Sequence, residues 1–128
     1  MRLDMKWLAL LLTFMLVGSF ALADDIPAKH AIKCIMGEAR GESFEGQVAV
    51  AEVIRRRGKL VGIYGCSYAT YTEAEWKEAE RAWKKSRYTN YSKGATHFES
   101  IDFKKPYWSK NMKLVTTIGK HQFYLEKK

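Results

Sequence analysis

The apolar run at positions 7–17 decides how much of this chain is available to fold. Basic residues precede the run, and the small residues Ala21 and Ala23 follow it. The run is too short to span a bilayer comfortably, and this order of features is typical of a secretory signal peptide. We therefore expect residues 1–23 to be removed on export and residues 24–128 to form one domain. The alternative is an uncleaved membrane anchor.

The expected mature chain is strongly basic. Removing Arg2, Lys6 and Asp4 with the leader lowers the formal net charge only from +8 to +7. A basic protein in the periplasm, cell envelope or exterior is attracted to polyanions there, such as the bacterial wall and anionic lipid surfaces. Export disfavours nucleic acid, the usual alternative partner. A surface that is basic only for solubility stays open, because charge alone identifies no substrate.

The chain has two cysteines, Cys34 and Cys66. An even number of cysteines in an exported protein favours a disulfide. This bond would close a loop of about thirty residues and contribute about 3–4 kcal/mol on the chain-entropy account. The alternative is two buried free thiols, because the sequence does not show how closely the two Cα atoms approach.

Apolar periodicity predicts three helices before the last third of the chain. The first begins at Pro27, a residue that suits a helix start, and ends near Gly37. The second begins at Ser43, a good N-cap, and stops at Gly58 after three arginines that interact well with the helix dipole. The third opens on the capping box Thr-x-x-Glu at 72–75.

The last third of the chain is richer in β-branched and aromatic residues. Residues 95–99 and 114–124 read as two strands, the second with a break at Gly119. A long aromatic connection that contains residues 106–108 joins them into a predicted hairpin. The expected fold class is therefore α+β, with about three helices followed by a C-terminal antiparallel hairpin or small sheet.

The segment 37–46, Gly-Glu-Ala-Arg-Gly-Glu-Ser-Phe-Glu-Gly, is the most informative part of the sequence. It places three carboxylates and three glycines between two apolar helices. Glycine lets the backbone turn sharply and lets other groups approach closely. A carboxylate at the end of a buried helix is poised for desolvation, which raises the pKa of a glutamate toward the range that a general acid needs. The pattern indicates an active site rather than a plain connector.

Residues 37–54 resemble the signature of the bacterial spore-cortex-lytic and cell-wall hydrolase family: Gly-Glu-Ala-Arg-Gly-Glu, an aromatic residue, then Glu-Gly-Gln-Val-Ala-Val-Ala. Weaker resemblances at 94–98, at Trp108 and at 117–124 extend the match across nearly the whole expected domain. The resemblance implies a small lysozyme-like or resuscitation-factor-like lytic domain. It also implies that Glu38 is the essential catalytic acid/base.

The reaction that this resemblance implies is cleavage of the β-1,4 bond between N-acetylmuramic acid and N-acetylglucosamine, as a lytic transglycosylase. Most glycosidases need two carboxyl groups, because water or an enzyme nucleophile attacks the sugar. A transglycosylase lets the muramic acid 6-hydroxyl attack instead, so one glutamate can donate and then accept the proton. The alternatives are a hydrolytic muramidase, a non-catalytic wall-binding protein of the same fold, and a secreted cationic membrane-active protein.

Five further residues are candidates for binding substrate. Arg40 either contacts substrate carboxylates or forms a structural ion pair. Glu42 is either a second active-site carboxylate or a structural group, paired with Arg40 or fixing a turn. Gln47 forms hydrogen bonds either with the sugar or with the protein backbone. Phe98 and Trp108 are the aromatic residues that we expect near a sugar groove, where rings stack on sugars, although most aromatic side chains are core.

The remaining expectations concern partners. No spacing of His30, His97 and His121 resembles a zinc motif, so we expect no metal and no cofactor. We expect a monomer that acts on peptidoglycan, without stable membrane insertion once the leader is removed. The chain departs from the family at Arg56, where relatives carry Asn, and it has no clear counterpart of their Gln-Phe-Ser loop, for which 68–71 is the nearest candidate.

Overall fold

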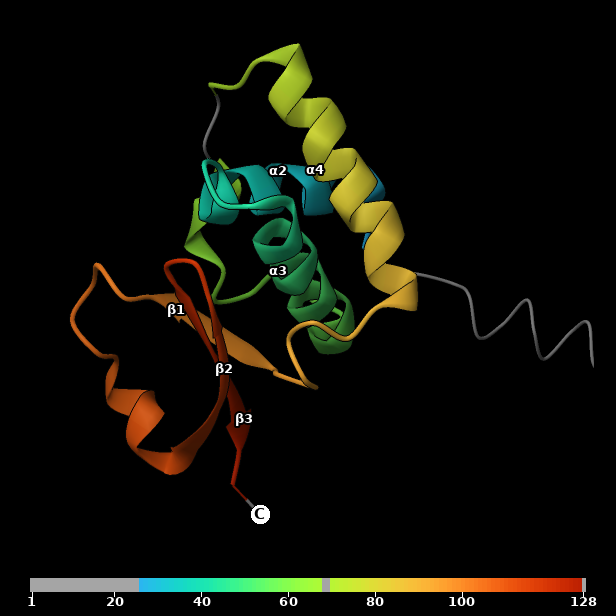
Figure 1. The fold of residues 1–128 in the computed structure, drawn as a ribbon. Coiled ribbons are helices and arrows are strands. Elements are labelled where there is room, and N and C mark those ends of the chain that lie inside the picture. The colour runs from blue at the N-terminus through green and yellow to red at the C-terminus, as the bar shows by residue number, and fades with distance from the viewer. Residues whose placement is uncertain (1–25, 68–69, 128) are drawn as a thin grey trace, which may run out of the picture.

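The computed structural model of the chain describes residues 26–67 and 70–127. The expected signal peptide lies outside these ranges. Within them, three α-helices come first and a three-stranded antiparallel sheet follows, which confirms the predicted α+β class (Figure 1). The helices are α2 (Ala28–Ala39), α3 (Phe44–Arg57) and α4 (Glu73–Lys85). The strands are β1 (His97–Ser100), β2 (Met112–Ile118) and β3 (His121–Glu126).

The helix boundaries follow the capping residues seen in the sequence. The Ser43 hydroxyl accepts a hydrogen bond from the Gly46 amide at 3.1 Å, and α3 ends on Gly58 in the left-handed region at φ 65°. Thr72 and Glu75 form the predicted capping box at the start of α4. No helix within residues 26–67 or 70–127 is long and apolar enough to cross a bilayer.

The strand pairing differs from the prediction. The expected strand 114–124 is two strands, β2 and β3, which turn at Gly119 and Lys120. The sheet order is β1-β3-β2, so the hairpin is β2–β3 and β1 pairs with β3. The prediction placed a break at Gly119 but wrongly kept both sides of it in one strand, because β-branched and aromatic residues continue on either side. Gly119 has φ 56°, which glycine adopts without strain.

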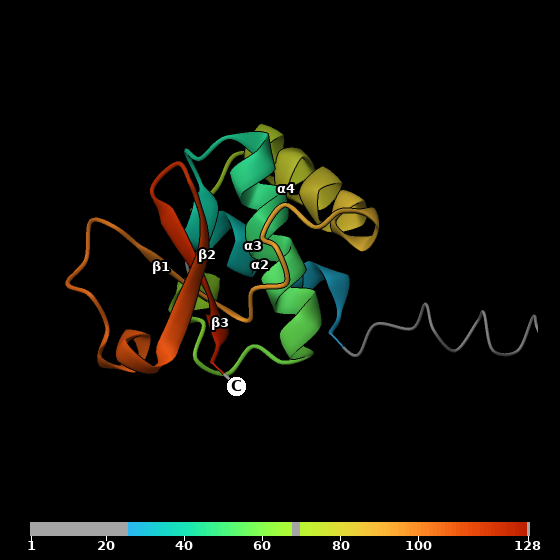
Figure 2. The same ribbon diagram turned by 60° about the horizontal axis from the view of Figure 1, so that its bottom comes forward.

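Helix α3 is the centre of the molecule. Every residue from Gly46 to Ile54 is buried, so the helix is enclosed on all sides rather than along one stripe. Figure 2 shows α3 between α4 and the sheet. Phe123 of β3 is fully buried and Phe98 of β1 is partly buried, and both pack against this core. The sheet therefore covers the face of α3 that the helices leave open.

Candidate functional site

The end of α2 lies directly against a short 3-10 helix, η1 (Tyr64–Ser67). A Cβ atom added to Gly37 would lie 1.7 Å from the carbonyl oxygen of Gly65, and one added to Gly65 would lie 2.6 Å from the carbonyl carbon of Gly37. No side chain fits at either position, so both glycines are needed for the two backbones to touch. The sequence indicated a close approach near Gly37, but it did not identify Gly65 as the partner.

A disulfide fastens η1 to α2 beside this contact. Cys34 and Cys66 are joined, with their Cα atoms 3.8 Å apart. Cys34 is buried one turn before Glu38 and on the same side of the helix, and Cys66 follows Gly65 in the chain. The covalent link therefore sits where η1 approaches Glu38.

Glu38 occupies the last turn of α2 and is half-buried. Its Oε1 atom accepts a hydrogen bond from the Gly65 backbone N–H at 2.8 Å. Among the described residues this is the carboxylate's one hydrogen bond, and Oε2 has no protein partner. The backbone donor fixes how the carboxyl group is oriented, while the second oxygen stays available to another molecule.

Glu42 is held against the turn between β2 and β3. Its Oε1 accepts a hydrogen bond from the Lys120 backbone N–H at 3.0 Å and lies 3.3 Å from His121 Nδ1. A Cβ on Gly119 would lie 2.3 Å from the Glu42 Oε2 atom, so this glycine makes room for the carboxylate. The His121 contact has the distance of an ion pair without the geometry of a hydrogen bond. These contacts match the turn-fixing alternative for Glu42.

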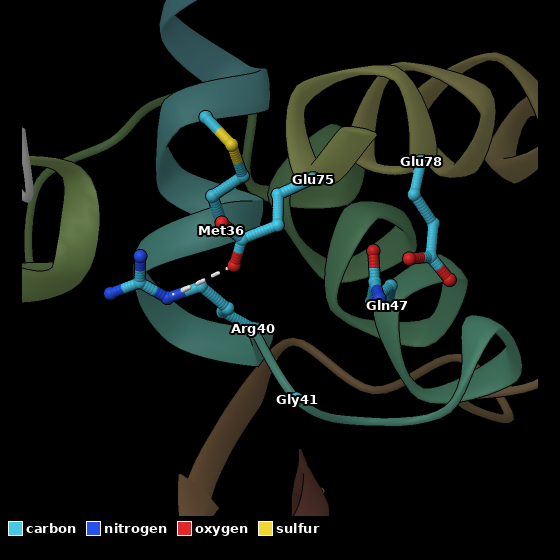
Figure 3. A pocket seen from close by; sticks show the side chains of 6 residues that line it. All are labelled: Met36, Arg40, Gly41, Gln47, Glu75 and Glu78. Carbon is cyan, nitrogen blue, oxygen red and sulfur yellow. Dashed lines mark ion pairs between the residues drawn. The ribbon is translucent and has the colours of Figure 1, made fainter. Parts of the chain in front are cut away.

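Arg40 and Gln47 both contact protein groups and line a small pocket, shown in Figure 3. Arg40 Nε lies 3.6 Å from Glu75 Oε2, and an Arg40 guanidinium nitrogen donates to the Thr70 carbonyl. The Thr72 backbone N–H, helped by the Arg40 charge, holds the pKa of Glu75 below its usual value. Gln47 donates to the Glu42 carbonyl at 3.3 Å. Arg40 thus has an ion pair and Gln47 a backbone bond, and any role in binding substrate stays a prediction.

The two aromatic candidates lie on opposite faces of the sheet. Phe98 packs on the inner face, with its ring 5.5 Å from that of His121. Trp108 belongs to the 3-10 helix η3 (Tyr107–Asn111) and lies on the outer face, with ring centroids 5.2 Å from His97 and 5.3 Å from Tyr124. Successive residues of a strand point to opposite faces, so His97 and Phe98 cannot share a groove on one face. The structure does not bring the two predicted groove residues together.

Burial on the outer face shifts the acid–base behaviour of two residues there. Desolvation lowers the pKa of His97, with the Arg57 charge acting in the same direction. Desolvation also raises the pKa of Tyr124, with help from the Glu99 charge. At neutral pH both effects favour uncharged rings. Within residues 26–67 and 70–127, no three His, Cys, Asp or Glu side chains gather closely enough to hold a metal ion.

A buried charged group in the middle of α3 was not predicted from the sequence. Glu52 is 2% exposed and accepts hydrogen bonds from the Tyr91 backbone N–H at 3.0 Å, the Ser92 backbone N–H at 2.8 Å and the Ser92 hydroxyl at 2.6 Å. The Thr89 hydroxyl is a further donor, at 2.5 Å. A lone carboxylate inside the apolar run 48–54 was the signal that could have revealed it, because a buried charge must be paired.

Arg56, the departure from the family pattern, contacts the buried Glu52 from the surface, with its side chain 28% exposed. Its guanidinium lies 3.7 Å from Glu52 and donates to Ser92 Oγ at 2.8 Å, the Ala95 carbonyl at 2.7 Å and Asn90 Oδ1 at 2.7 Å. Burial lowers the pKa of Arg56, and the Glu52 charge opposes that shift. Together the two charges hold the loop that leads into β1.

Solved structures with the same fold include two catalytic domains. The catalytic domain of the Bacillus cereus SleB protein is 22% identical with a TM-score of 0.64, and the match covers 80% of this chain and 98% of that one. The catalytic domain of the germination-specific lytic transglycosylase SleB from Bacillus anthracis is 23% identical with a TM-score of 0.60, covering 80% and 94%. At this identity the likeness establishes the fold, and it confirms at that level the resemblance to spore-cortex-lytic enzymes. No protein-family model and no curated protein sequence matches the chain.

Proposed function

We propose that this protein cleaves the glycan strand of peptidoglycan at the β-1,4 bond between N-acetylmuramic acid and N-acetylglucosamine, with Glu38 as the acid/base. The observation that carries the proposal is the state of the Glu38 carboxyl group. One oxygen is fixed by the Gly65 N–H at 2.8 Å, and the other has no partner among the described residues. The likeness in fold to a lytic transglycosylase domain supports the same reaction.

In the proposed reaction, the protonated Glu38 first donates its proton to the oxygen that leaves with N-acetylglucosamine. The glycosidic bond breaks, and the muramic acid 6-hydroxyl oxygen then attacks C1 of its own ring. The Glu38 carboxylate accepts the proton of that hydroxyl and returns to its starting state. The products are a free 4-hydroxyl on N-acetylglucosamine and a 1,6-anhydro-muramic end, and no water is consumed.

The surroundings of Glu42 favour this route over hydrolysis. A hydrolytic glycosidase needs a second carboxylate to activate water or to form a glycosyl intermediate. Glu42 is the nearest other acid in the motif, but its side chain is only 13% exposed, accepts a bond from Lys120 and faces His121. A carboxylate held in this way is poorly placed to serve a sugar. A hydrolytic muramidase remains the second candidate, in which Glu42 leaves the turn when substrate binds.

The site of action follows from the substrate. Peptidoglycan lies outside the cytoplasmic membrane, so the proposal requires export, which residues 1–23 would direct. Without residues 1–23 the formal net charge is +7, which would hold the protein near the wall and other anionic polymers of the envelope. We propose that the domain works there as a monomer.

Product analysis tests the proposal. The protein, purified after export from a bacterial host, is incubated with purified sacculi, and the released fragments are analysed by mass spectrometry. We expect the turbidity to fall and the fragments to carry 1,6-anhydro-muramic ends. Fragments with reducing muramic acid ends would instead support the hydrolytic muramidase. Sacculi that bind the protein without losing turbidity would overturn the enzymatic proposal and favour a wall-binding protein.

A further inference from the structure

The connection between β1 and β2 exposes several apolar side chains. Residues 101–111 project away from the helices in both views (Figure 1, Figure 2). Within this segment Ile101, Phe103 and Tyr107 are 52%, 69% and 86% exposed, and Leu114, just after it, is 47% exposed. Single exposed apolar residues are common, but several of them on one projecting segment make that segment a candidate contact surface.

The segment is held in place at both of its ends. At its start, the Ile101 N–H donates to the Lys120 carbonyl at 2.7 Å. Near its end, the Ser109 N–H and hydroxyl donate to the Pro106 carbonyl at 3.0 and 2.7 Å and close the turn of η3. Trp108 anchors η3 by packing on the outer face of the sheet. The exposed side chains are therefore presented outward by an ordered backbone.

Lysines alternate with the same apolar side chains along the sequence. Lys104, Lys105, Lys110 and Lys113 are all exposed, and none of them forms an ion pair with another described residue. The segment's one acid, Asp102, is already paired with a lysine outside it, Lys120, at 3.4 Å. Four lysines without an ion pair to a described residue thus lie close in sequence to exposed apolar side chains, while one acid of β3, Glu126, lines the same pocket as Tyr107.

We propose that residues 101–114 dock this protein on the surface of an anionic lipid bilayer. The lysines contact lipid phosphates, and Phe103 and Tyr107 enter the headgroup region. A hydrophilic wall polymer would satisfy the lysines but would leave Ile101 and Phe103 in water, whereas a bilayer interface accommodates both. The contact is peripheral, because the segment is too short to enter the hydrocarbon core deeply. This inference goes beyond the proposed cleavage of peptidoglycan and does not depend on it.

Vesicle sedimentation tests the inference. The exported protein is mixed with vesicles of phosphatidylcholine alone or of phosphatidylcholine with phosphatidylglycerol, and the bound fraction is measured. We expect binding only to the anionic vesicles. The double change Lys104→Glu and Lys105→Glu should weaken this binding by about tenfold or more, because each basic residue near an anionic surface contributes substantially. Phe103→Ala should weaken it severalfold by removing apolar contact with the interface.

Two matched controls lie on other surfaces. Lys77→Glu with Lys84→Glu makes the same change in net charge on α4, where these side chains are 63% and 74% exposed. Tyr88→Ala removes an aromatic side chain that is 81% exposed, after the end of α4. Both controls should bind anionic vesicles nearly as well as the unchanged protein.

Three outcomes would overturn the inference. One is an equal loss of binding in the control pair, which would mean that net charge alone drives association. Another is the same affinity for both kinds of vesicle. The third is a Phe103→Ala protein that binds vesicles normally but binds sacculi less well, which would assign the segment to the glycan. Vesicle binding is measured without any cleavage, so its failure is distinct from a failure of the proposed reaction.

Discussion

Two glutamates on neighbouring helices show how differently this fold treats a carboxylate. Glu52 on α3 is 2% exposed, accepts bonds from Thr89, Tyr91 and Ser92, and lies 3.7 Å from Arg56. Glu38 on α2 is half-buried and accepts one bond from a described residue. A carboxylate whose oxygens already accept hydrogen bonds from the protein has no free acceptor site for a substrate. The number of protein donors therefore separates the structural carboxylate from the one that we propose is reactive.

The largest expected effect on stability comes from Glu52→Ala. Removing the carboxylate leaves the donors of the loop and the Arg56 charge without their partner, so the free energy of unfolding should fall by about 3–5 kcal/mol. Urea denaturation followed by circular dichroism measures the change. Glu80→Ala, which removes an acid from the surface of α4, should cost little in the same assay. Comparable losses in the two variants would mean that the buried group contributes no special stability.

The disulfide supports the surroundings of Glu38. Replacing both Cys34 and Cys66 with alanine should lower the free energy of unfolding by about 3–4 kcal/mol, because the bond closes a long loop in the unfolded chain. It should also slow cleavage of sacculi, because η1 carries the Gly65 donor. Dithiothreitol should lower the melting temperature of the unchanged protein toward that of the variant and leave the variant unaffected. Unchanged stability in both tests would contradict this account.

Glu42→Gln tests a third carboxylate, whose role the sequence left open. The amide oxygen can still accept the Lys120 N–H, but the charge that faces His121 is lost, so we expect a loss of about 1–2 kcal/mol of stability. Cleavage should decrease only modestly. A variant that melts normally but has lost all cleavage would instead make Glu42 a second catalytic carboxylate and would favour the hydrolytic muramidase.

The smallest expected effect is a dependence on pH through His97. Because burial lowers the His97 pKa, the unfolded chain takes up a proton more readily than the folded protein as the pH falls through about 6.5. Stability that is present at neutral pH should therefore decrease on acidification. His97→Gln should flatten this part of the melting temperature profile between neutral and mildly acidic pH. A profile that is identical with and without His97 would show that the ring does not titrate differently on folding.

The helical half of the fold could be read from the sequence because its signals are local. Each capping signal acts within one turn of the helix that it starts or ends, so it can be recognised in a short stretch of sequence. These signals are Ser43, Gly58 and the capping box at 72–75. The strand order and pairing of the sheet were harder to predict. The break at Gly119 was visible, but strand-forming residues on both sides of it did not show that the chain reverses there. The pairing of β1 with β3 depends on contacts between distant parts of the chain.

The candidate site likewise has a part that could be predicted from the sequence and a part that could not. The motif around Glu38 is contiguous, and it pointed to a carboxylate at the end of a helix. The partners that fix that carboxylate, Gly65 and the disulfide-linked η1, come from 27 residues further along and carry no motif of their own. The Glu52 group was missed for the related reason that its donors sit in a loop 37–40 residues away.

The rate at which the Glu38→Gln protein digests purified sacculi decides whether Glu38 is the acid/base. The amide can still accept the Gly65 N–H but cannot transfer a proton, so we predict a loss of cleavage of about a hundredfold to ten-thousandfold with little change in melting temperature. Glu45→Gln, the same change on an exposed residue in the first turn of α3, should keep nearly full activity. A Glu38→Gln protein that clears sacculi as fast as the unchanged protein would contradict the assignment of the reactive carboxylate.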